Sequence, residues 1–434
     1  MAGMLRGWAK KVVERVTFNA RYQQRYQDTL RVYLLTEMYS RVPRELLGGA
    51  GLRGRFQSFR VDGGEGGEGG EGGGTEGGTA EKGEQEETAI GGELVLQMPD
   101  PNTVNKLSLR ELERLSEDHL RRQVHRLFDA VVAMGGADVY PSAEYAASIR
   151  GTLQHREKKP SPPLSPSSLR LEEDKRDGDE EGGGKGRYEV REEDGETDVR
   201  QALSEEAVLE RPIRHPDGFT LRIKRSGISH PSAGFGVHVE GVVLPGTVVA
   251  AYPGIGYFPR SVPREAVSGN DYLLGRYDGM VLDARGWGER SVGAREELRR
   301  WIEAGLQGSG RSLGAGMPQE CLNPFGIASY VNHPPPGAEA NVVWHAYDFS
   351  EANTPTPHRP YVPGRLHSPS DLFHPQSSPL LAVTVLFVTS RVVADEELLL
   401  DYRLNPKLPY PAWYSPCDLD EAHRRWSPQS IWFA

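Results

Sequence analysis

Two polar stretches carry the side chains of this sequence that are best suited to chemistry. The first, residues 329–341, reads SYVNHPPPGAEAN and holds an amide, an imidazole and three consecutive prolines. Proline fixes φ and has no N–H, so Pro334–Pro336 exclude a helix or a central strand. Apolar residues flank the stretch on both sides, which predicts a loop held between buried strands. Loops of this kind often position functional side chains.

The second stretch, residues 395–402, reads DEELLLDY and combines a turn with an apolar run that ends in Asp401 and Tyr402. Two further features precede both stretches: Gly234-Phe235-Gly236 opens a β-rich run, and Ala251-Tyr252-Pro253-Gly254 closes the next one. Each has an ordinary structural interpretation when it is taken alone. Glycine pairs before strands are usually turn residues, a loop histidine usually makes hydrogen bonds, and a tyrosine at a strand end is usually half-buried.

Taken in order, the four features resemble the pattern of the SET-domain protein methyltransferases: GxG, a tyrosine–glycine strand end, an N-H loop closed by a further Asn, and E-E-L-x-x-D-Y. A narrower resemblance is to the branch called SET domain-containing protein nine, which shares the long spacer before Asn341, the phrase NP ahead of the loop and the Arg-rich N-terminal helix. The resemblance covers residues 212–404 well. It implies a mainly β (α+β) fold, a SET-domain β-clip with a threaded pseudoknot loop, preceded by N-terminal helices and disordered linkers.

The resemblance also implies a function, an S-adenosylmethionine-dependent protein-lysine methyltransferase. The cofactor-binding residues that it implies are Gly234, Phe235, Gly236, Asn332 and His333. The catalytic residues are Tyr402, which would orient a deprotonated lysine amine, and Tyr252, a second wall of the lysine channel. Asn341 and Glu397 are expected to hold the threaded loop. Methyl transfer is an in-line displacement, so catalysis would consist mainly of alignment and exclusion of water.

The sequence departs from the family pattern next to the histidine. Pro334-Pro335 replace the usual Ser-Cys, the loop is longer than in the best-known members, and the cysteine-rich flanks are absent. With only Cys321 and Cys417 a Cys-rich zinc cluster is excluded, and no metal site is expected. These departures leave an alternative open, a catalytically inactive SET-fold protein that binds or scaffolds partners.

Composition limits the partners and the compartment. The 434-residue chain carries a net charge of -10, which does not suggest a nucleic-acid binder. It has no run of eighteen apolar residues, so no membrane-spanning helix is expected. The expected partner is a protein substrate of unknown identity that offers a lysine side chain. The few cysteines favour an intracellular compartment, either the nucleus or the cytoplasm. The basic N-terminal helix makes the mitochondrion a third option.

Composition shifts divide the chain. The expected parts are a basic amphipathic helical N-terminus (1–50), a Gly/Glu-rich disordered linker (61–95), a helical segment (101–150), a disordered Pro/Ser-rich and then acidic linker (155–205), the SET domain (212–404) and an aromatic C-terminal tail (405–434). The N-terminus is open to two interpretations, a transit peptide or a helix that docks on the rest of the protein. Ser108 is the expected N-cap of the helical segment. Its apolar positions suit either partner binding or a core, and we expect a small helical module that packs on residues 1–50.

Six β-rich runs are expected in the main domain: 219–223, 236–239, 247–252, 280–282, 341–347 and 381–388. Two inserts separate them. The first, 286–322, is expected to contain a helix over Arg295–Gly305, and the second, 351–379, to be a surface loop. The tail has six aromatic residues, which we expect either to pack over Tyr402 and complete a lysine channel or to be ordinary core residues: Tyr410, Trp413, Tyr414, Trp426, Trp432 and Phe433.

Overall fold

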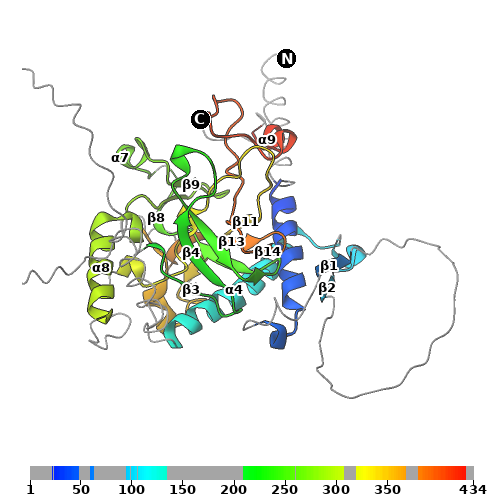
Figure 1. Ribbon diagram of the computed structural model, residues 1–434. Coiled ribbons are helices and arrows are strands. Elements are labelled where there is room, and N and C mark those ends of the chain that lie inside the picture. The colour runs from blue at the N-terminus through cyan, green and yellow to red at the C-terminus, as the bar shows by residue number, and fades with distance from the viewer. Residues whose placement is uncertain are drawn as a thin grey trace, which may run out of the picture.

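The computed structural model describes residues 22, 24–47, 59–62, 94–97, 99–104, 106–133, 209–259, 261–306, 319–367 and 380–426 (Figure 1). Residues 1–21, where the two interpretations of the N-terminus diverge, lie outside them. The second predicted linker and most of the first also lie outside, as does the end of the tail. At the borders of the first linker, strands β1 (Phe59–Asp62) and β2 (Leu94–Gln97) pair in parallel.

The described chain is a mixed α+β protein built mainly from short strands, as the sequence predicted. The strands after residue 209 are β3 (Ile213–Arg214), β4 (Thr220–Arg225), β5 (Phe235–Glu240), β6 (Val242–Val243), β7 (Val248–Ala251), β8 (Gly254–Tyr257), β9 (Leu273–Gly275), β10 (Val281–Asp283), β11 (Val342–Ser350), β12 (Gly364–Leu366), β13 (Leu380–Thr389) and β14 (Val393–Ala394). They form sheets in the orders β12-β8-β10-β9, β11-β13-β7 and β3-β4-β5, and a β14-β6 pair. The helices are 24–40, α3 (Pro101–Val104), α4 (Leu109–Ala133), α7 (Arg264–Val267), α8 (Val292–Leu306) and α9 (Leu419–Arg425).

Each of the six β-rich runs predicted from the sequence overlaps a strand. The longest, β13, reads LLAVTVLFVT and pairs on both edges, antiparallel to β11 and to β7. Its continuous apolar sequence fits a strand that is covered on both faces. In contrast, β4 alternates buried and half-exposed residues along TLRIKR, which is typical of a strand with one face on the core.

The predicted helical segment begins where the sequence indicated. In a capping box, the Glu111 amide donates to Ser108 Oγ (3.3 Å) and the Ser108 amide donates to Glu111 Oε2 (2.8 Å). Along α4, buried residues recur at three- and four-residue spacing, so one face of the helix is apolar.

This helix packs on helix 24–40 and also on the β-rich domain. The buried side chain of Gln123 in α4 donates to the Gly246 carbonyl (2.9 Å) and accepts from the Val248 amide (2.8 Å), at the start of β7. Leu35 and Met38 of helix 24–40 join the same hydrophobic cluster as the sheets. In Figure 1, α4 runs along the strands and the blue helix 24–40 lies beside it.

The two inserts differ in how well they were predicted. The helix expected in the first lies within α8. The second contains β12, which pairs in parallel with β8, so its middle is not a surface loop. A Cβ on Gly364 would lie 2.7 Å from the Gly254 carbonyl oxygen, and this close approach needs glycine. At three residues, Gly-Arg-Leu, β12 is too short to show an alternating apolar pattern, which is why it was not predicted from the sequence.

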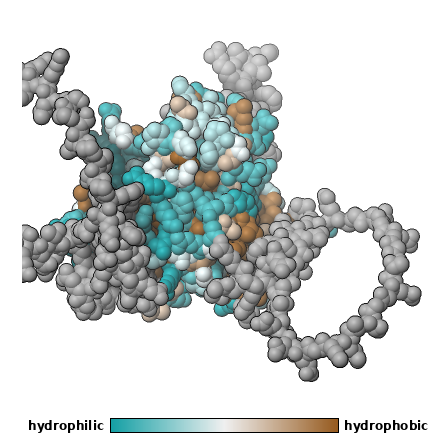
Figure 2. All heavy atoms as spheres, in the orientation of Figure 1, coloured by the Kyte–Doolittle hydropathy of each residue, from teal (hydrophilic) through white to brown (hydrophobic). Residues whose placement is uncertain are grey.

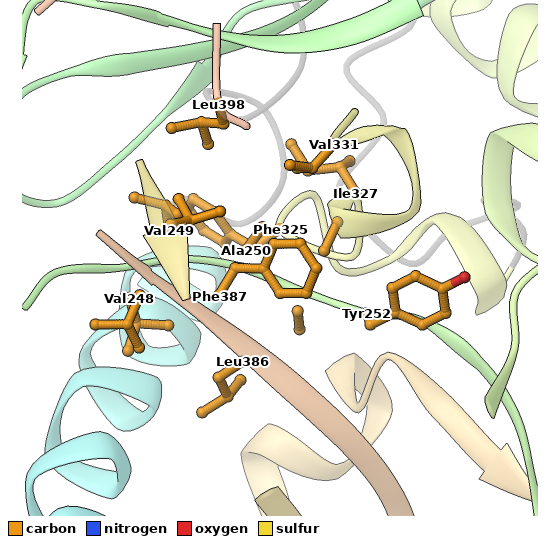
Figure 3. Packing of buried hydrophobic residues seen from close by; sticks show 14 of the residues in the cluster. Val248, Val249, Ala250, Tyr252, Phe325, Ile327, Val331, Leu386, Phe387 and Leu398 are labelled. Atoms are coloured by element: carbon orange, nitrogen blue, oxygen red, sulfur yellow. The ribbon is translucent and has the colours of Figure 1, made fainter. Parts of the chain in front are cut away.

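The core fixes the loop that precedes Asn332. Phe325, Ile327 and Val331 are almost fully buried and pack with Val249 and Phe387 of the central sheet (Figure 3). Tyr252 borders this cluster and turns its hydroxyl away from it. Hydrophobic burial therefore holds the backbone on either side of the predicted site.

On the face shown in Figure 2, the described residues are mostly hydrophilic, with smaller hydrophobic areas among them. Within the ranges given above, no helix combines the length and the hydropathy that crossing a bilayer requires.

Candidate functional site

One large pocket, about 1690 Å³ in volume, collects most of the residues selected from the sequence. Its walls come from the turn 228–235, the β9 hairpin 270–277, the loop 328–336, the strand end 400–405 and tail residues 411–413. The predicted residues that line it are Gly234, Phe235, Tyr252, Asn332, His333 and Tyr402. The remaining one, Gly236, does not line the pocket and packs against Glu397 instead.

The carboxylate of Glu397 joins the glycine turn to the Asn332 loop. It accepts hydrogen bonds from Ser226 Oγ (2.8 Å) and from the Gly227 amide (2.9 Å). It also accepts from Asn332 Nδ2 (3.0 Å), which donates its second hydrogen to the Phe235 carbonyl (3.1 Å). Both amide hydrogens of Asn332 are thus used within the protein. What this residue offers a ligand is its backbone and its amide oxygen.

Asn341 is fully buried and ties the loop to the last motif. Its Nδ2 donates to the Glu397 carbonyl (2.8 Å), and its Oδ1 accepts from the Leu399 amide (2.7 Å). At the other end of the loop, the Leu400 amide donates to the Asn332 carbonyl (2.8 Å). The segment 397–400 therefore lies alongside both ends of the loop.

Gly236→Ala is expected to lower the free energy of unfolding by about 2–4 kcal/mol. The new Cβ would lie 2.0 Å from Glu397 Oε1, and this carboxylate cannot swing away without losing the hydrogen bonds described above. Denaturant unfolding measures the change. Gly275→Ala is the matched control, because nothing lies within 4 Å of a Cβ there and its φ is not positive. Equal midpoints for the two variants would contradict the role given to Glu397.

His333 is buried and its ring is held on both sides. Nε2 bonds to the Ser415 carbonyl (2.7 Å), Nδ1 accepts from the Tyr402 amide (3.3 Å), and the ring stacks on Tyr414 at 4.3 Å. A backbone amide can only donate, so Nδ1 carries the lone pair and Nε2 the hydrogen. Burial lowers the pKa of His333, and the ring is neutral near pH 7.

The two candidate catalytic tyrosines both donate their phenol hydrogens to backbone carbonyls. Tyr402 Oη donates to Val331 (2.9 Å) and Tyr252 Oη donates to Tyr272 (2.9 Å). Burial raises the pKa of Tyr402 to about 12 and raises the pKa of Tyr252 as well, so both phenols stay neutral at physiological pH. Tyr402 still exposes 38% of its surface, which faces the pocket. Because each phenol hydrogen is used within the protein, each phenol oxygen can still accept a hydrogen bond from a ligand.

Sequence reasoning missed Arg290, a cation of the pocket wall. Its guanidinium lies between the rings of Tyr272 and Tyr330, 3.9 Å from each centroid, and donates to Ser329 Oγ (3.0 Å) and the Ser329 carbonyl (2.5 Å). Its charge acts on both phenols described above and opposes the rise of their pKa values. Arg290 is the last residue of the short 3-10 helix η3 (Gly288–Arg290) in the first insert. It belongs to none of the four sequence motifs, so the sequence did not indicate that it lines the pocket.

The C-terminal tail packs beside Tyr402 in the described structure. The Trp413 ring is 6.1 Å from the Tyr402 ring and nearly perpendicular to it, and Trp426 Nε1 donates to the Arg403 carbonyl (2.9 Å). Tyr414 is buried, whereas Trp413 is half-exposed and lines the pocket. The tail thus supplies both core packing and pocket wall; the predicted aromatic residues Trp432 and Phe433 lie outside the described residues.

The chain was compared with family models, curated proteins and solved structures, and none of the three comparisons gave a match. The site is therefore interpreted from its own geometry.

Proposed function

We propose that this chain is a SET-fold methyltransferase that moves a methyl group from S-adenosylmethionine to a lysine side chain of a protein. The observation that carries the proposal is the pocket, where Gly234, the Asn332–His333 loop and Tyr402 meet although about 170 residues separate the first from the last. A chance likeness of short motifs would not require these segments to share one cavity.

The contacts of the last motif support the threaded connection that the SET fold would need. Residues 397–400 bond to the loop at Asn332 and again at Asn341, and Val239 donates its amide to the Glu396 carbonyl (2.9 Å) from the other side. We infer that the loop passes through the turn that these bonds close.

The residues present fit the proposed cofactor. Gly234 has a φ of +57°, and nothing lies within 4 Å of where its Cβ would be, so a ligand can approach the backbone closely there. Small-molecule pockets usually measure about 300–1,000 Å³. This one is larger and has room for a cofactor and a substrate side chain together. When bound, S-adenosylmethionine would supply a sulfonium methyl group: the amine lone pair would form a bond to the methyl carbon as the C–S bond breaks, and the rest of the cofactor would leave as a neutral thioether.

The chain's own residues would orient the amine and exclude water. The phenol of Tyr402 points its hydrogen at Val331, so its oxygen can accept a hydrogen bond from the incoming amine and aim the nitrogen lone pair. Trp413 packs against the Tyr402 ring, and Tyr252 lines the same pocket. The fixed charge of Arg290 disfavours a protonated lysine nearby and favours the neutral amine that attacks.

The second candidate is a SET-fold binding protein without turnover. Pro335, one of the two prolines that replace the Ser-Cys of the family pattern, lines the pocket beside Pro336, and this favours the candidate. A binding protein without turnover would not need unobstructed backbone at Gly234. The methyltransferase is therefore expected to bind S-adenosylmethionine, and the binding protein is not.

Calorimetric titration of S-adenosylmethionine into the full chain is expected to show one binding site, weakened about tenfold or more by Gly234→Ala. A Cβ at this position would project into the space that the cofactor would use. The full chain is needed because α4 contributes to the core of the domain.

Gly269→Ala is the matched control. It has nearly the same φ, +59°, with open space around a Cβ, and Gly269 does not line the pocket. Both variants should lose about 1–2 kcal/mol of stability from backbone strain. Equal affinities for the two would contradict the cofactor position, and no binding by a folded wild-type chain would favour the binding protein without turnover.

A further inference from the structure

The pocket borders a group of potential metal ligands drawn from three distant segments. A ring nitrogen of His333, a carboxylate oxygen of Asp401 and Sγ of Cys417 all lie within 4.8 Å of one another. The first comes from the loop, the second from the strand end and the third from the tail. We propose that these residues bind a transition-metal ion of the zinc class, which fastens the tail to the pocket. This proposal does not depend on the proposed enzymatic function.

The geometry of the histidine favours this site. The Nε2 hydrogen is held by the Ser415 carbonyl, so Nδ1 carries the lone pair, and this atom lies 3.8 Å from Asp401 Oδ1. Metal-binding histidines usually donate their other ring hydrogen to a carbonyl or carboxylate in this way. Ligand atoms at zinc-bond lengths of about 2.0–2.3 Å in a tetrahedron lie roughly 3.3–3.8 Å apart, so the three atoms, which lie within 4.8 Å of one another, would close around an ion after small side-chain shifts.

The short separation of His333 Nδ1 and Asp401 Oδ1 is electrostatically unfavourable when no cation lies between them. In the neutral ring, Nδ1 and the nearby Asp401 oxygen are both acceptors. Nδ1 takes its hydrogen bond from the Tyr402 amide at a long 3.3 Å, and Asp401 Oδ1 takes one from Tyr414 Oη at 3.5 Å. The Asp401 oxygen is itself held in place by the Arg403 amide (3.0 Å). Two acceptors that the backbone holds opposite each other form a preformed site for a positive ion.

The donor set indicates the kind of metal. One imidazole, one carboxylate and one thiol suit Zn²⁺ and its neighbours, whereas Ca²⁺ and Mg²⁺ prefer oxygen ligands alone. Cys417 is exposed, so an ion can reach the site from solvent. This group was not predicted from the sequence, because its members are residues 333, 401 and 417 and follow no metal-binding spacing.

The test uses the full chain after removal of metals with a chelator, titrated with Co²⁺ as a spectroscopic substitute for Zn²⁺. The expected result is one Co²⁺ per chain with a thiolate-to-cobalt charge-transfer band, displaced by Zn²⁺. The band should vanish in Cys417→Ser and persist in Cys321→Ala, which removes the chain's other thiol away from the site. Asp401→Asn should weaken Co²⁺ binding at least tenfold.

A second measurement is thermal unfolding, because an ion that binds the folded chain stabilises it. Zn²⁺ should raise the Tm of wild type and of Cys321→Ala, and should leave that of Cys417→Ser unchanged. No thiolate band in wild type, or a band that survives in Cys417→Ser, would overturn the proposal. Neither measurement involves S-adenosylmethionine, so failure here is distinct from failure of the proposed function.

Discussion

Tyr402→Phe is expected to lower the turnover number about 100-fold or more while the affinity for S-adenosylmethionine stays within about twofold. The phenol oxygen is the acceptor that would aim the substrate amine, and the aromatic ring that packs against Trp413 remains in the variant. Transfer of a labelled methyl group to a lysine peptide obtained by screening gives the turnover number, and calorimetry gives the cofactor affinity.

The pH dependence adds a second requirement. With a pKa of about 12, Tyr402 keeps its proton at pH 7.5 and at pH 9, so the loss caused by the variant should be the same at both. The rate of wild type should rise between these values, because a lysine amine with an ordinary pKa near 10.4 becomes increasingly deprotonated. A loss that grows with pH would instead indicate that the phenol takes part in proton transfer.

Tyr252→Phe is the comparison for this experiment. Tyr252 also donates to a carbonyl, but it is 7% exposed and has little surface toward the pocket. We expect a loss of less than about tenfold. If Tyr252→Phe proves the more damaging change, the two tyrosines exchange the roles proposed for them.

Local patterns explain how much of this architecture was predictable. The strands around the site were visible because β13 and its neighbours are apolar over a length typical of strands, and the start of α4 was visible because Ser108 and Glu111 form a capping box. The residues that meet in the pocket were found through the order of four motifs, each of which was weak alone.

What the sequence did not reveal depends on packing between distant segments. Arg290 enters the pocket because two tyrosines from other segments enclose it, and β12 joins its sheet through a contact between glycines. Gln123 reads as one polar residue on an amphipathic helix, although in the structure it bonds to the backbone that precedes β7. Such residues are determined by their partners in space, which single-sequence periodicity does not encode.

The tail offers the second large effect: a chain that ends after Asn405 should lose methyl transfer at least 100-fold and keep its sheets folded. Truncation removes Trp413 from Tyr402 and removes both Tyr414 and the Ser415 carbonyl from His333. The pocket would then open to water on the side where the amine must be aligned. Circular dichroism checks the fold, and retained turnover would refute a tail that completes the site.

A single substitution tests the same idea with less disturbance, because α9 is anchored through Arg425. Its guanidinium donates to both oxygens of Asp28 in helix 24–40 (2.6 and 2.8 Å) and to the Tyr277 hydroxyl (2.9 Å). Burial would raise the pKa of Asp28, but the hydrogen bonds and charge of Arg425 keep it lowered. The pair therefore stabilises the fold above the ordinary pKa of aspartate, and this contribution is lost as the pH falls through the lowered value.

Arg425→Met should cost about 3 kcal/mol, because it leaves the Asp28 carboxylate largely buried without its main partner. Turnover should fall about tenfold or more as the tail loosens. Arg424→Met makes the same chemical change at the exposed neighbouring residue and should alter neither quantity. Adding Asp28→Asn to Arg425→Met should restore much of the stability, because it removes the unpaired buried charge. It should restore little of the turnover, because the tail still lacks its ion pair with helix 24–40. Recovery of both together would mean that the tail affects methyl transfer only through global stability.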